Sequence, residues 1–527
     1  MRSLCLYTFF TISIFLMISC DDNGKQQSNN NNNNNNNINS VCGNDVQEGS
    51  EPCDGSDFGN RTCATEGYHE GGTLACSATC TLDVTNCQKR CGNGFVEPGE
   101  ECDTGDNADP GCSESCEVNP GWSCSGQPSE CIRTCGNGML DPGEVCEGTD
   151  IGDAVCANLG WGYGVPSCTE NCELDRNACF TITSIAAGYY HTCAVDTQKR
   201  VWCWGDNLMG QLGNGTMEMR SAFPVRIPEI SNALDVVAGE YYTCVLLEDH
   251  TVKCWGSNIS FELGNGTGNP STTPVPVTNV TDAVALSAGR NHTCAVQQAG
   301  TIRCWGDNFD GKLGTTGSPP LSVAVTGIDN AVLVTAGENH TCALLSDQTV
   351  KCWGSHAFGQ LGTGTNIPNS ATPVVVAGLS GVDDLAAGGL HTCAVLSDHT
   401  VKCWGSNANV ELGDGTTNDA NAPVTSNATG VRVKSGGFHT CVLGEDGLLS
   451  CWGSNDFGQL GAGSNEAMST SALEVNQLVD VSVFSAGYQH NCAVGADQIV
   501  KCWGDNSAFK CGANGDSFNE PVAVSSF

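Results

Sequence analysis

Pairs of cysteines ten residues apart recur along the C-terminal part of the chain, from residue 184 to the end. Each pair lies in a segment that reads as a hairpin, such as HTCALLSDQTVKCWG at 340–354, where two apolar strands flank a polar turn. An odd-length turn places both cysteines on one side of neighbouring strands, where their Cβ atoms are close enough to be bridged. The seven predicted disulfides are Cys193–Cys203, Cys244–Cys254, Cys294–Cys304, Cys342–Cys352, Cys393–Cys403, Cys441–Cys451 and Cys492–Cys502.

Overall composition decides between disulfides and small core thiols that stay reduced. The chain of 527 residues holds 35 Cys, which argues against a reducing cytosol. In an exported chain we expect disulfides, each contributing at most about 2.7 kcal/mol on the chain-entropy model. Cys511 is then left odd and is expected to be buried. The formal net charge of -37 disfavours nucleic acid, because phosphate binding needs clustered Lys and Arg.

Histidines also recur once per repeat, at His191, His292, His340, His391, His439 and His490. A ring of histidines could bind a metal, but residues that recur with a repeat are usually hydrogen-bond partners inside it, so we expect no metal there. Nucleophile-elbow, phosphate-loop and zinc-hydrolase motifs are absent from the sequence. We therefore predict no catalytic residues and a protein that is not an enzyme.

Acidic residues concentrate in a cysteine-rich region near the N-terminus. Clustered carboxylates can hold extracellular calcium, but the ligand spacing of an EF-hand is missing. We therefore expect a solvated acidic surface, and calcium is the one cofactor kept as an alternative. Zinc is disfavoured because cysteines in an oxidising compartment form disulfides first. The calcium candidates are Glu97, Glu100, Glu101, Asp103, Asp141 and Glu144.

This region holds eighteen cysteines between Cys42 and Cys179, in three groups of six that define units at 42–90, 91–134 and 135–180. Units this small rely on disulfides rather than on a core, so we expect three bridges in each. Fifteen pairings per unit stay open. In the middle unit Cys124 has no counterpart, which leaves its bridges free to differ. The openings, such as CGNGFVEPGEEC, resemble cysteine-rich repeats of myxobacterial surface proteins, which implies a surface location.

The N-terminus predicts export. A basic start at Arg2 is followed by an apolar run typical of a signal peptide at 1–19, too short to span a membrane. The run ends in Met17-Ile18-Ser19-Cys20, which resembles a bacterial lipobox, with Met17 where leucine is usual. The resemblance implies lipidation of Cys20; the alternative is an ordinary cleaved signal. Residues 20–41 are Asn-rich and are expected to be a disordered tether. The predicted location is the bacterial cell envelope, lipid-anchored or extracellular.

The elements that carry the cysteine pairs repeat with a period of about fifty residues. The dipeptide Trp-Gly recurs at Trp204, Trp255, Trp305, Trp353, Trp404, Trp452 and Trp503. Four short strands per period form one blade, so 181–527 is predicted to be a seven-bladed β-propeller in an all-β protein. The chain ends in a Pro-Val-x-Val segment, and the array begins with the half that follows this segment elsewhere. We expect the two ends to share one blade and so close the ring.

This repeat resembles the regulator of chromosome condensation repeat family. The carriers include His340-Thr341, Trp353-Gly354 and Gln360-Leu361-Gly362. Departures are Tyr242 in place of the histidine, His356 in place of an asparagine, and Cys511 in place of a leucine. The resemblance implies a propeller. One nuclear member drives nucleotide exchange on a small GTPase, but export and the acidic charge argue against that activity here.

The function predicted from these features is binding. A monomeric propeller on a disulfide-rich stalk would present loops, such as 265–278 and 362–372, to a protein or glycan partner at the cell surface. The alternatives are an extracellular enzyme with its site in the propeller funnel, or a passive envelope protein. Polar residues that break the repeat and converge on one face would separate these alternatives. Tyr242, His356 and Glu445 break it, but they lie in different blades and form no evident constellation, which favours binding over an enzyme.

Overall fold

The computed structural model describes residues 45–47, 51–88, 90–105, 111–119, 122–133, 135–136, 138–140, 144–317, 319–524 and 527. The predicted signal peptide, the lipidation site at Cys20, the tether, Cys42 and Asp141 lie outside the described residues. The chain divides into two compact units, residues 1–133 and 134–527, and each is treated by itself. Among the described residues, no helix combines the length and apolar character that crossing a membrane requires.

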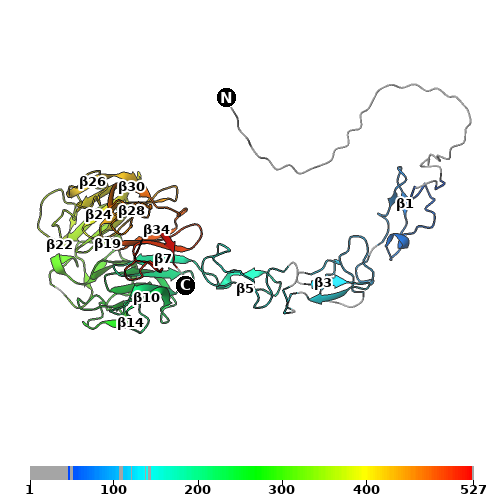
Figure 1. Ribbon diagram of the computed structural model, residues 1–527, viewed down its shortest axis with the longest axis horizontal. Coiled ribbons are helices and arrows are strands. Elements are labelled where there is room, and N and C mark those ends of the chain that lie inside the picture. The colour runs from blue at the N-terminus through cyan, green and yellow to red at the C-terminus, as the bar shows by residue number, and fades with distance from the viewer. Residues whose placement is uncertain are drawn as a thin grey trace, which may run out of the picture. The chain divides into compact units, whose positions relative to one another are not determined.

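Seven four-stranded antiparallel sheets form a β-propeller, as the repeats predict (Figure 1). Blade 1 is β7(Ile182–Ala187), β8(His191–Asp196), β9(Val201–Asp206) and β10(Arg220–Arg226); blade 2 is β11(Ala233–Ala238), β12(Tyr242–Leu247), β13(Val252–Gly256) and β14(Ser271–Pro276); blade 3 is β15(Ala283–Ala288), β16(His292–Gln297), β17(Ile302–Gly306) and β18(Val323–Ala324). Blade 4 is β19(Ala331–Ala336), β20(His340–Leu345), β21(Val350–Gly354) and β22(Ser370–Val375); blade 5 is β23(Val382–Ala387), β24(His391–Leu396), β25(Thr400–Gly405) and β26(Ala420–Thr429). Blade 6 is β27(Arg432–Ser435), β28(His439–Leu443), β29(Leu449–Ser454) and β30(Met468–Glu474); blade 7 is β31(Val483–Ala486), β32(His490–Val494), β33(Val500–Asp505) and β34(Ser517–Ala523).

The second and third strands of each blade form the hairpin that the sequence predicts. In blade 4 the polar turn is closed by Asp347, whose carboxylate accepts the Thr349 backbone N–H at 3.1 Å and its hydroxyl at 2.6 Å. Gln348 takes the left-handed conformation, with φ 62°. The resulting register sets Cys342 opposite Cys352, as the odd-length turn predicts.

The core lies between neighbouring blades. The seven tryptophans of the Trp-Gly dipeptides are fully buried. Trp305 of blade 3, for example, packs with Cys244, Val252 and Leu263 of blade 2, and its indole N–H donates to the Glu262 carbonyl at 3.0 Å. Each blade therefore buries its tryptophan against the preceding blade, which is why the repeat must close into a ring.

The closure that we expected from the sequence is wrong. The Pro-Val-x-Val segment at the C-terminus forms β34, which pairs with β33 of its own blade through Cys502 and Val522. The first strand of the array, β7, pairs with β8. Every blade is therefore built from four consecutive strands, and no blade is shared. The ring closes by side-to-side contact: the Tyr488 N–H donates to the Gly188 carbonyl at 3.1 Å, and the Ala187 N–H to the Ser485 hydroxyl at 3.0 Å.

The cysteine-rich units are loops with short ladders: β1(Ala75–Cys76) with β2(Leu82–Asp83), β3(Trp122–Ser125) with β4(Glu130–Arg133), and β5(Ser167–Cys168) with β6(Leu174–Asp175). The 3-10 turns of the described residues are η1(Ala64–Glu66), η2(Arg176–Ala178) and η3(Phe309–Gly311). The described disulfides of the units are Cys53–Cys76, Cys63–Cys87, Cys91–Cys116, Cys102–Cys112, Cys124–Cys131, Cys135–Cys172, Cys146–Cys168 and Cys156–Cys179. The middle unit differs at Cys124, which bridges within a hairpin of its own.

The third cysteine-rich unit is packed onto the propeller at the junction of blades 7 and 1. Tyr163 and Phe180 of this unit are buried in the same core cluster as Trp204 of blade 1 and Val500 of blade 7. The Tyr163 hydroxyl accepts the Val500 N–H at 2.7 Å, and the Tyr163 ring lies 4.3 Å from that of Phe527. Residue 181 thus begins the first blade without marking the edge of a separately packed unit.

Candidate functional site

The hairpin cysteines occupy the buried centre of each blade. Their Cα atoms are 4.0–4.1 Å apart and their sulfur atoms lie at bonding distance, 2.05–2.12 Å. All of these side chains are at most 1% exposed. Cys511 is unpaired and buried, and burial raises the pKa of its thiol. These residues brace the blades and present no surface to a ligand.

The six repeat histidines link neighbouring blades. Each Nε2 lies 2.7–2.9 Å from the hydroxyl of a threonine in the next blade, or from the Asn491 side chain in blade 7. The threonine hydroxyl donates onward to a backbone carbonyl, as Thr243 does to Gln211 at 2.9 Å. It must therefore accept from Nε2–H, which fixes the tautomer. With Nε2 occupied in this way, the histidines hold the ring together.

Burial keeps these histidines neutral. Burial lowers the pKa of His191, His340 and His391 to about 3, and that of His439 to about 4. The Nδ1 atoms of all six histidines have no hydrogen-bond partner among the described residues. A second proton would therefore place a charge in the core with nothing to accept it.

Two of the residues that break the repeat keep the role of the residue they replace. The Tyr242 hydroxyl donates to the His292 carbonyl at 2.6 Å and accepts from Thr293 at 3.0 Å, which supplies the link between blades 2 and 3. His356 Nδ1 accepts the Leu361 N–H at 3.2 Å, as the Asn207 side chain accepts that of Leu212 at 3.0 Å. The third, Glu445, is exposed and lies 3.2 Å from His399. These residues do not form a site.

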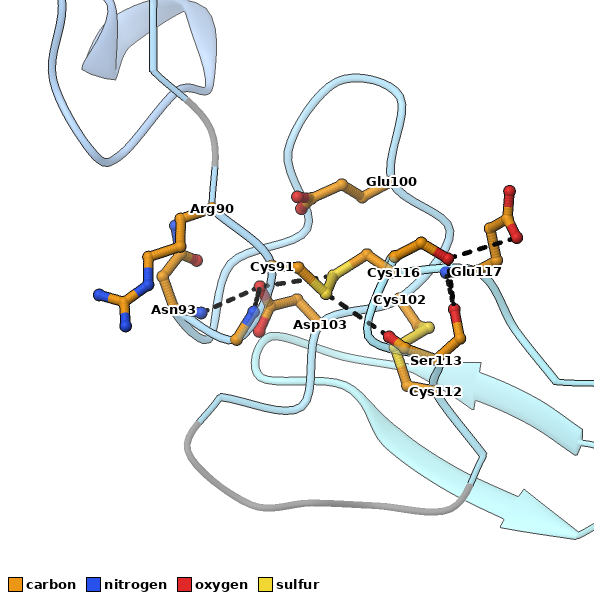
Figure 2. The surroundings of a disulfide bond; sticks show 12 residues. Arg90, Cys91, Asn93, Glu100, Cys102, Asp103, Cys112, Ser113, Cys116 and Glu117 are labelled. Atoms are coloured by element: carbon orange, nitrogen blue, oxygen red, sulfur yellow. Dashed lines mark hydrogen bonds between the residues drawn. A yellow bond between two sulfur atoms is a disulfide. The ribbon is translucent and has the colours of Figure 1, made fainter.

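The acidic calcium candidates organise the cysteine-rich loops. Asp103 is fully buried and accepts the backbone N–H groups of Gly92, Asn93, Gly94 and Gly105 at 2.7–3.1 Å. Figure 2 shows Asp103 beside Asn93 and the Cys91–Cys116 disulfide. Burial alone would raise the pKa of the Asp103 carboxyl, but these four donors outweigh it and the pKa lies below its ordinary value. N–H donors turned toward a carboxylate occupy the oxygen positions that a cation would need.

The calcium candidates near Asp103 in the sequence also accept backbone N–H groups. Glu97 is buried and accepts the His69 N–H at 2.5 Å and the Arg90 N–H at 3.0 Å. Glu100 accepts the Glu97 N–H at 2.9 Å, and Glu101 accepts the Val118 N–H at 3.1 Å. Glu144 lies near Glu147 and the Cys135–Cys172 disulfide. The sequence carried a signal for this structural role of the acidic residues. Each unit has an acidic residue directly after its second cysteine: Asp54, Asp103 and Glu147.

A different set of residues meets at one mouth of the central channel. The first strand of every blade ends in a glycine-containing turn before the second strand. In every blade except the second, where Glu240 holds this position, the residue after that glycine lines the channel cavity. We call these the mouth residues: Tyr189, Glu240, Arg290, Glu338, Gly389, Gly437 and Tyr488. Repeat symmetry places them at one end of the ring, above a cavity of about 360 Å³. They differ from blade to blade, whereas the strands around them are nearly constant.

The mouth residues contact one another across the channel. Arg290 is held by both oxygens of Glu240, at 3.0 and 3.2 Å. The Tyr189 hydroxyl of blade 1 donates to Glu338 of blade 4 at 3.2 Å, forming a bar across the opening. Burial, followed by the Glu338 charge, raises the pKa of Tyr189 well above its ordinary value. Blades 5 and 6 contribute glycines, so one side of the mouth carries no side chain.

Aromatic rings continue from the mouth over blades 6, 7, 1 and 2. Tyr189 stacks on Tyr488 with ring centroids 4.4 Å apart, and Tyr190 stacks on Tyr241 at 4.9 Å. Phe438 meets the edge of Tyr488 at 5.3 Å. We call Phe438, Tyr488, Tyr189, Tyr190 and Tyr241 the aromatic arc; all five are partly exposed.

The same face carries an outer row of apolar side chains. The third strand of each blade ends beside the start of the second, as Gly256 pairs with Tyr242, so the loops that follow the Trp-Gly strands lie on the mouth face. Leu208, Ile259 and Phe309 occupy one equivalent position in blades 1 to 3 and are 52%, 74% and 68% exposed. We call these three the apolar row. The loop parts of the predicted binding segments 265–278 and 362–372 precede β14 and β22 on this face.

Buried lysines support two of the mouth loops. Lys510 lies 2.6 Å from Asp505 and donates to the Tyr189 carbonyl at 3.1 Å. Lys312 lies 2.7 Å from Asp307 and donates to the Glu338 carbonyl at 3.1 Å. Both stand where other blades carry Gln or Glu. Through its hydrogen bond to a backbone carbonyl, each lysine ties a mouth residue to the neighbouring blade.

Sequence reasoning missed the mouth residues, although a signal was present. Within a strongly regular repeat, the position after the glycine of the first turn reads Tyr, Glu, Arg, Glu, Gly, Gly and Tyr. Variation at one position of an otherwise constant unit marks a place that packing does not dictate. Repeat-breaking polar residues do converge on one face, but they are not the three that we singled out.

Comparison with known proteins agrees with this architecture. The family described as RCC1-like domain matches residues 281–527, and the Regulator of chromosome condensation (RCC1) repeat matches 199–246 and 249–296. Together with a second match to this repeat at 182–211 and 234–261, these models match the propeller from residue 182 to residue 527. The propeller of yeast RCC1 (Prp20), solved with Kap60, superposes with a TM-score of 0.56 at 21% identity, covering 62% of this chain and 84% of that one. Human WBSCR16 gives 0.54 at 22% identity, over 59% and 86%. At these identities the likeness concerns the fold.

Curated relatives match over shorter segments, each covering 16% of this chain. They include pim1 of Schizosaccharomyces pombe, 34% identical over 89 residues and 16% of that protein, and the human probable E3 ubiquitin-protein ligase HERC4, 34% identical over 85 residues and 8% of that protein. The ultraviolet-B receptor UVR8 of Arabidopsis thaliana is 31% identical over 86 residues and 20% of its length. The matched segments thus span a fifth or less of these relatives. The similarity to them is therefore limited to a few repeat units.

Proposed function

We propose that the mouth face of this RCC1-repeat propeller docks a protein partner. The observation that carries the proposal is the apolar row, in which three large apolar side chains stand exposed at one equivalent position of consecutive blades. Exposed apolar patches of this kind mark interaction surfaces. The aromatic arc and Arg290 add the residue types that dominate binding energy at protein interfaces. A glycan partner is the second candidate, because partly exposed tyrosines also suit sugars.

Known members support a protein partner. Yeast RCC1 was solved bound to Kap60, and Prp20p of Saccharomyces cerevisiae has binding properties toward Gsp1p and histones. The same propeller architecture thus serves several protein partners. For this chain we propose binding without catalysis, since the polar side chains at the mouth hold one another in place. Nucleotide exchange is not proposed, because the cysteine pairs favour a location outside the reducing cytosol.

The docking face is tested with one charge on the apolar row. Ile259→Asp places a carboxylate at the centre of the proposed contact and is expected to weaken partner capture at least tenfold, since it buries an unpaired charge. The matched control is Val332→Asp, because Val332 is 53% exposed at the start of β19, on the opposite face. Affinity capture from surface extract, followed by titration of the captured protein, gives the readout. Equal loss in both variants, or in neither, would contradict the mouth face as the contact.

We further propose that the chain is exported and anchored at the cell surface, with the cysteine-rich units as a stalk. The support is the number of cysteine pairs at bonding distance in a chain whose N-terminus resembles a lipoprotein signal. Short disulfide-closed loops suit a spacer that must stay folded outside the cell. Lipidation at Cys20 would attach this stalk to a membrane.

The compartment is tested by trapping thiols in the state that they have in the cell. When cells are lysed directly into denaturant that contains an alkylating reagent and no reductant, we expect the propeller to yield one labelled cysteine, Cys511, and no labelled hairpin cysteine. After reduction all of its cysteines should be labelled. Peptide mapping by mass spectrometry gives the readout. Labelling of Cys342 or Cys352 before reduction would show that the pairs are thiols in the cell and would remove the argument for export.

A further inference from the structure

Of the three charged mouth residues, Glu240, Arg290 and Glu338, only Glu338 has no ion pair among the described residues. Arg290 is held by Glu240, Lys312 by Asp307 and Lys510 by Asp505, at distances of 2.6–3.0 Å. Glu338 lies among them without an ion-pair partner in the part of the chain that the structure describes. Its one side-chain hydrogen bond there is from the Tyr189 hydroxyl, to Oε1. Glu338 Oε2 is therefore free to accept a donor from outside.

The surroundings of Glu338 suit a cation. Tyr189, which contacts the carboxylate, is stacked on Tyr488, and tyrosine faces attract ammonium and guanidinium groups. The opening beside Tyr488 is bare because blades 5 and 6 contribute Gly389 and Gly437. Gly437 is required there, since a Cβ on it would lie 2.5 Å from the Cδ2 ring carbon of Tyr488. Gly437 thus makes room for the aromatic ring of Tyr488, and the space beside that ring can hold a narrow side chain.

The space below the mouth is small, and its wall combines small side chains with larger apolar ones and with Asp235 and Lys434. The cavity of about 360 Å³ is bounded by the first strands of the blades, with Ala186, Ser287 and Thr335 among its walls. This volume lies near the lower end of the usual range for ligand pockets, roughly 300–1,000 Å³. It suits one extended side chain. The net charge of -37 over the whole chain further favours a basic partner.

We propose that the channel mouth receives a protonated lysine or arginine side chain of the docked protein, which pairs with Glu338 and lies against the rings of Tyr488 and Tyr189. The inference rests on the proposed docking face and names the chemistry recognised at its centre. The hydrogen bond between Tyr189 and Glu338 lies at the place where the cation would bind. The apolar row supplies area around it, so the cation is the polar anchor of a larger contact.

The test uses a short peptide as probe, acetyl-Gly-Lys-Gly-amide, with its Nζ-acetylated form as neutral control and the arginine peptide as second arm. Binding to the full chain is followed by the NMR signals of labelled tyrosine rings. We expect the lysine or arginine peptide to shift the Tyr189 and Tyr488 signals, and the acetylated peptide to leave them unchanged. Glu338→Gln, which keeps the acceptor for Tyr189, should weaken binding at least fivefold.

The matched control is Glu445→Gln, which removes the same charge from an exposed turn at the opposite end of the blades, paired with His399. It should leave the affinity unchanged. Equal weakening in both variants, equal binding of the acetylated peptide, or no ring shift with either cationic peptide would overturn the proposal. A partner that needs Ile259 but is indifferent to Glu338→Gln would overturn the cation site alone. Peptide binding without any partner on the apolar row would overturn only the docking face.

Discussion

Replacing Tyr163 with alanine is expected to lower the free energy of unfolding of the propeller by about 4 kcal/mol, the usual loss for a large buried aromatic side chain. Tyr163 is 7% exposed and belongs to the core at the junction of blades 7 and 1. Its ring packs against Phe527, and its hydroxyl accepts the Val500 N–H. The variant leaves a cavity where the ring of blades has no covalent continuity. The melting temperature of the propeller transition, by calorimetry, is the measurement.

Two variants separate burial from other effects in this test. Tyr163→Phe keeps the ring and loses only the acceptor, so we expect about 1 kcal/mol. Leu159→Ala changes an exposed residue of the same unit and should leave the transition in place. Equal melting of Tyr163→Ala and Leu159→Ala would show that the third cysteine-rich unit does not stabilise the ring. A stabilising role means that a propeller fragment should begin at residue 134 and not at 181.

Lowering the pH from 7 to 5 is expected to destabilise the propeller by an amount that the buried histidines set. Their folded-state pKa is depressed, to about 3 for His191, His340 and His391. The unfolded chain takes up protons below pH 6.5 and the folded chain does not, so stability is full above that pH and is lost as the pH falls toward 3. At pH 5 each histidine lowers the free energy of unfolding by about 2 kcal/mol, 1.36 kcal/mol for each of 1.5 pH units.

Denaturant unfolding at several pH values between 5 and 7 measures this dependence. The slope should approach six protons taken up on unfolding, and His391→Gln should reduce it by one. Gln348→Asn, at an exposed turn residue that carries no titratable group, is the control and should leave the slope unchanged. Burial raises the pKa of Glu262 and Glu411, which acts in the opposite direction, and the single-histidine variants separate the two contributions. A flat profile between pH 5 and 7 would show that the histidines are protonated in the folded ring.

Several features were predictable because they depend on contacts close in sequence. The hairpin register that opposes Cys342 and Cys352 follows from the ten-residue spacing and the turn at Asp347. The blade count follows from the period of Trp-Gly, and each tryptophan is a core residue. The middle cysteine-rich unit departs where Cys124 departs.

Other features were missed because they depend on which strand pairs with which partner across the ring. The Pro-Val-x-Val segment has an equally plausible neighbour on either side in the sequence, and its pairing with Cys502 is decided by the strand order in space. The link between Tyr189 and Glu338 joins residues 149 positions apart. No local pattern encodes such a distance, although the variation at that position of the repeat marks where to look.

The sequence by itself determined the repeat, the hairpins and the cysteine pairs within the hairpins, because each of these depends on residues that lie within one repeat of about fifty residues. Tertiary structure alone decided how the ring closes, that the third cysteine-rich unit packs into the junction through Tyr163, and that the mouth residues meet. The physical reason is the geometry of a closed ring, which brings one position of every blade to a common axis. At that axis packing sets few constraints, so charge and aromatic character are free to serve recognition.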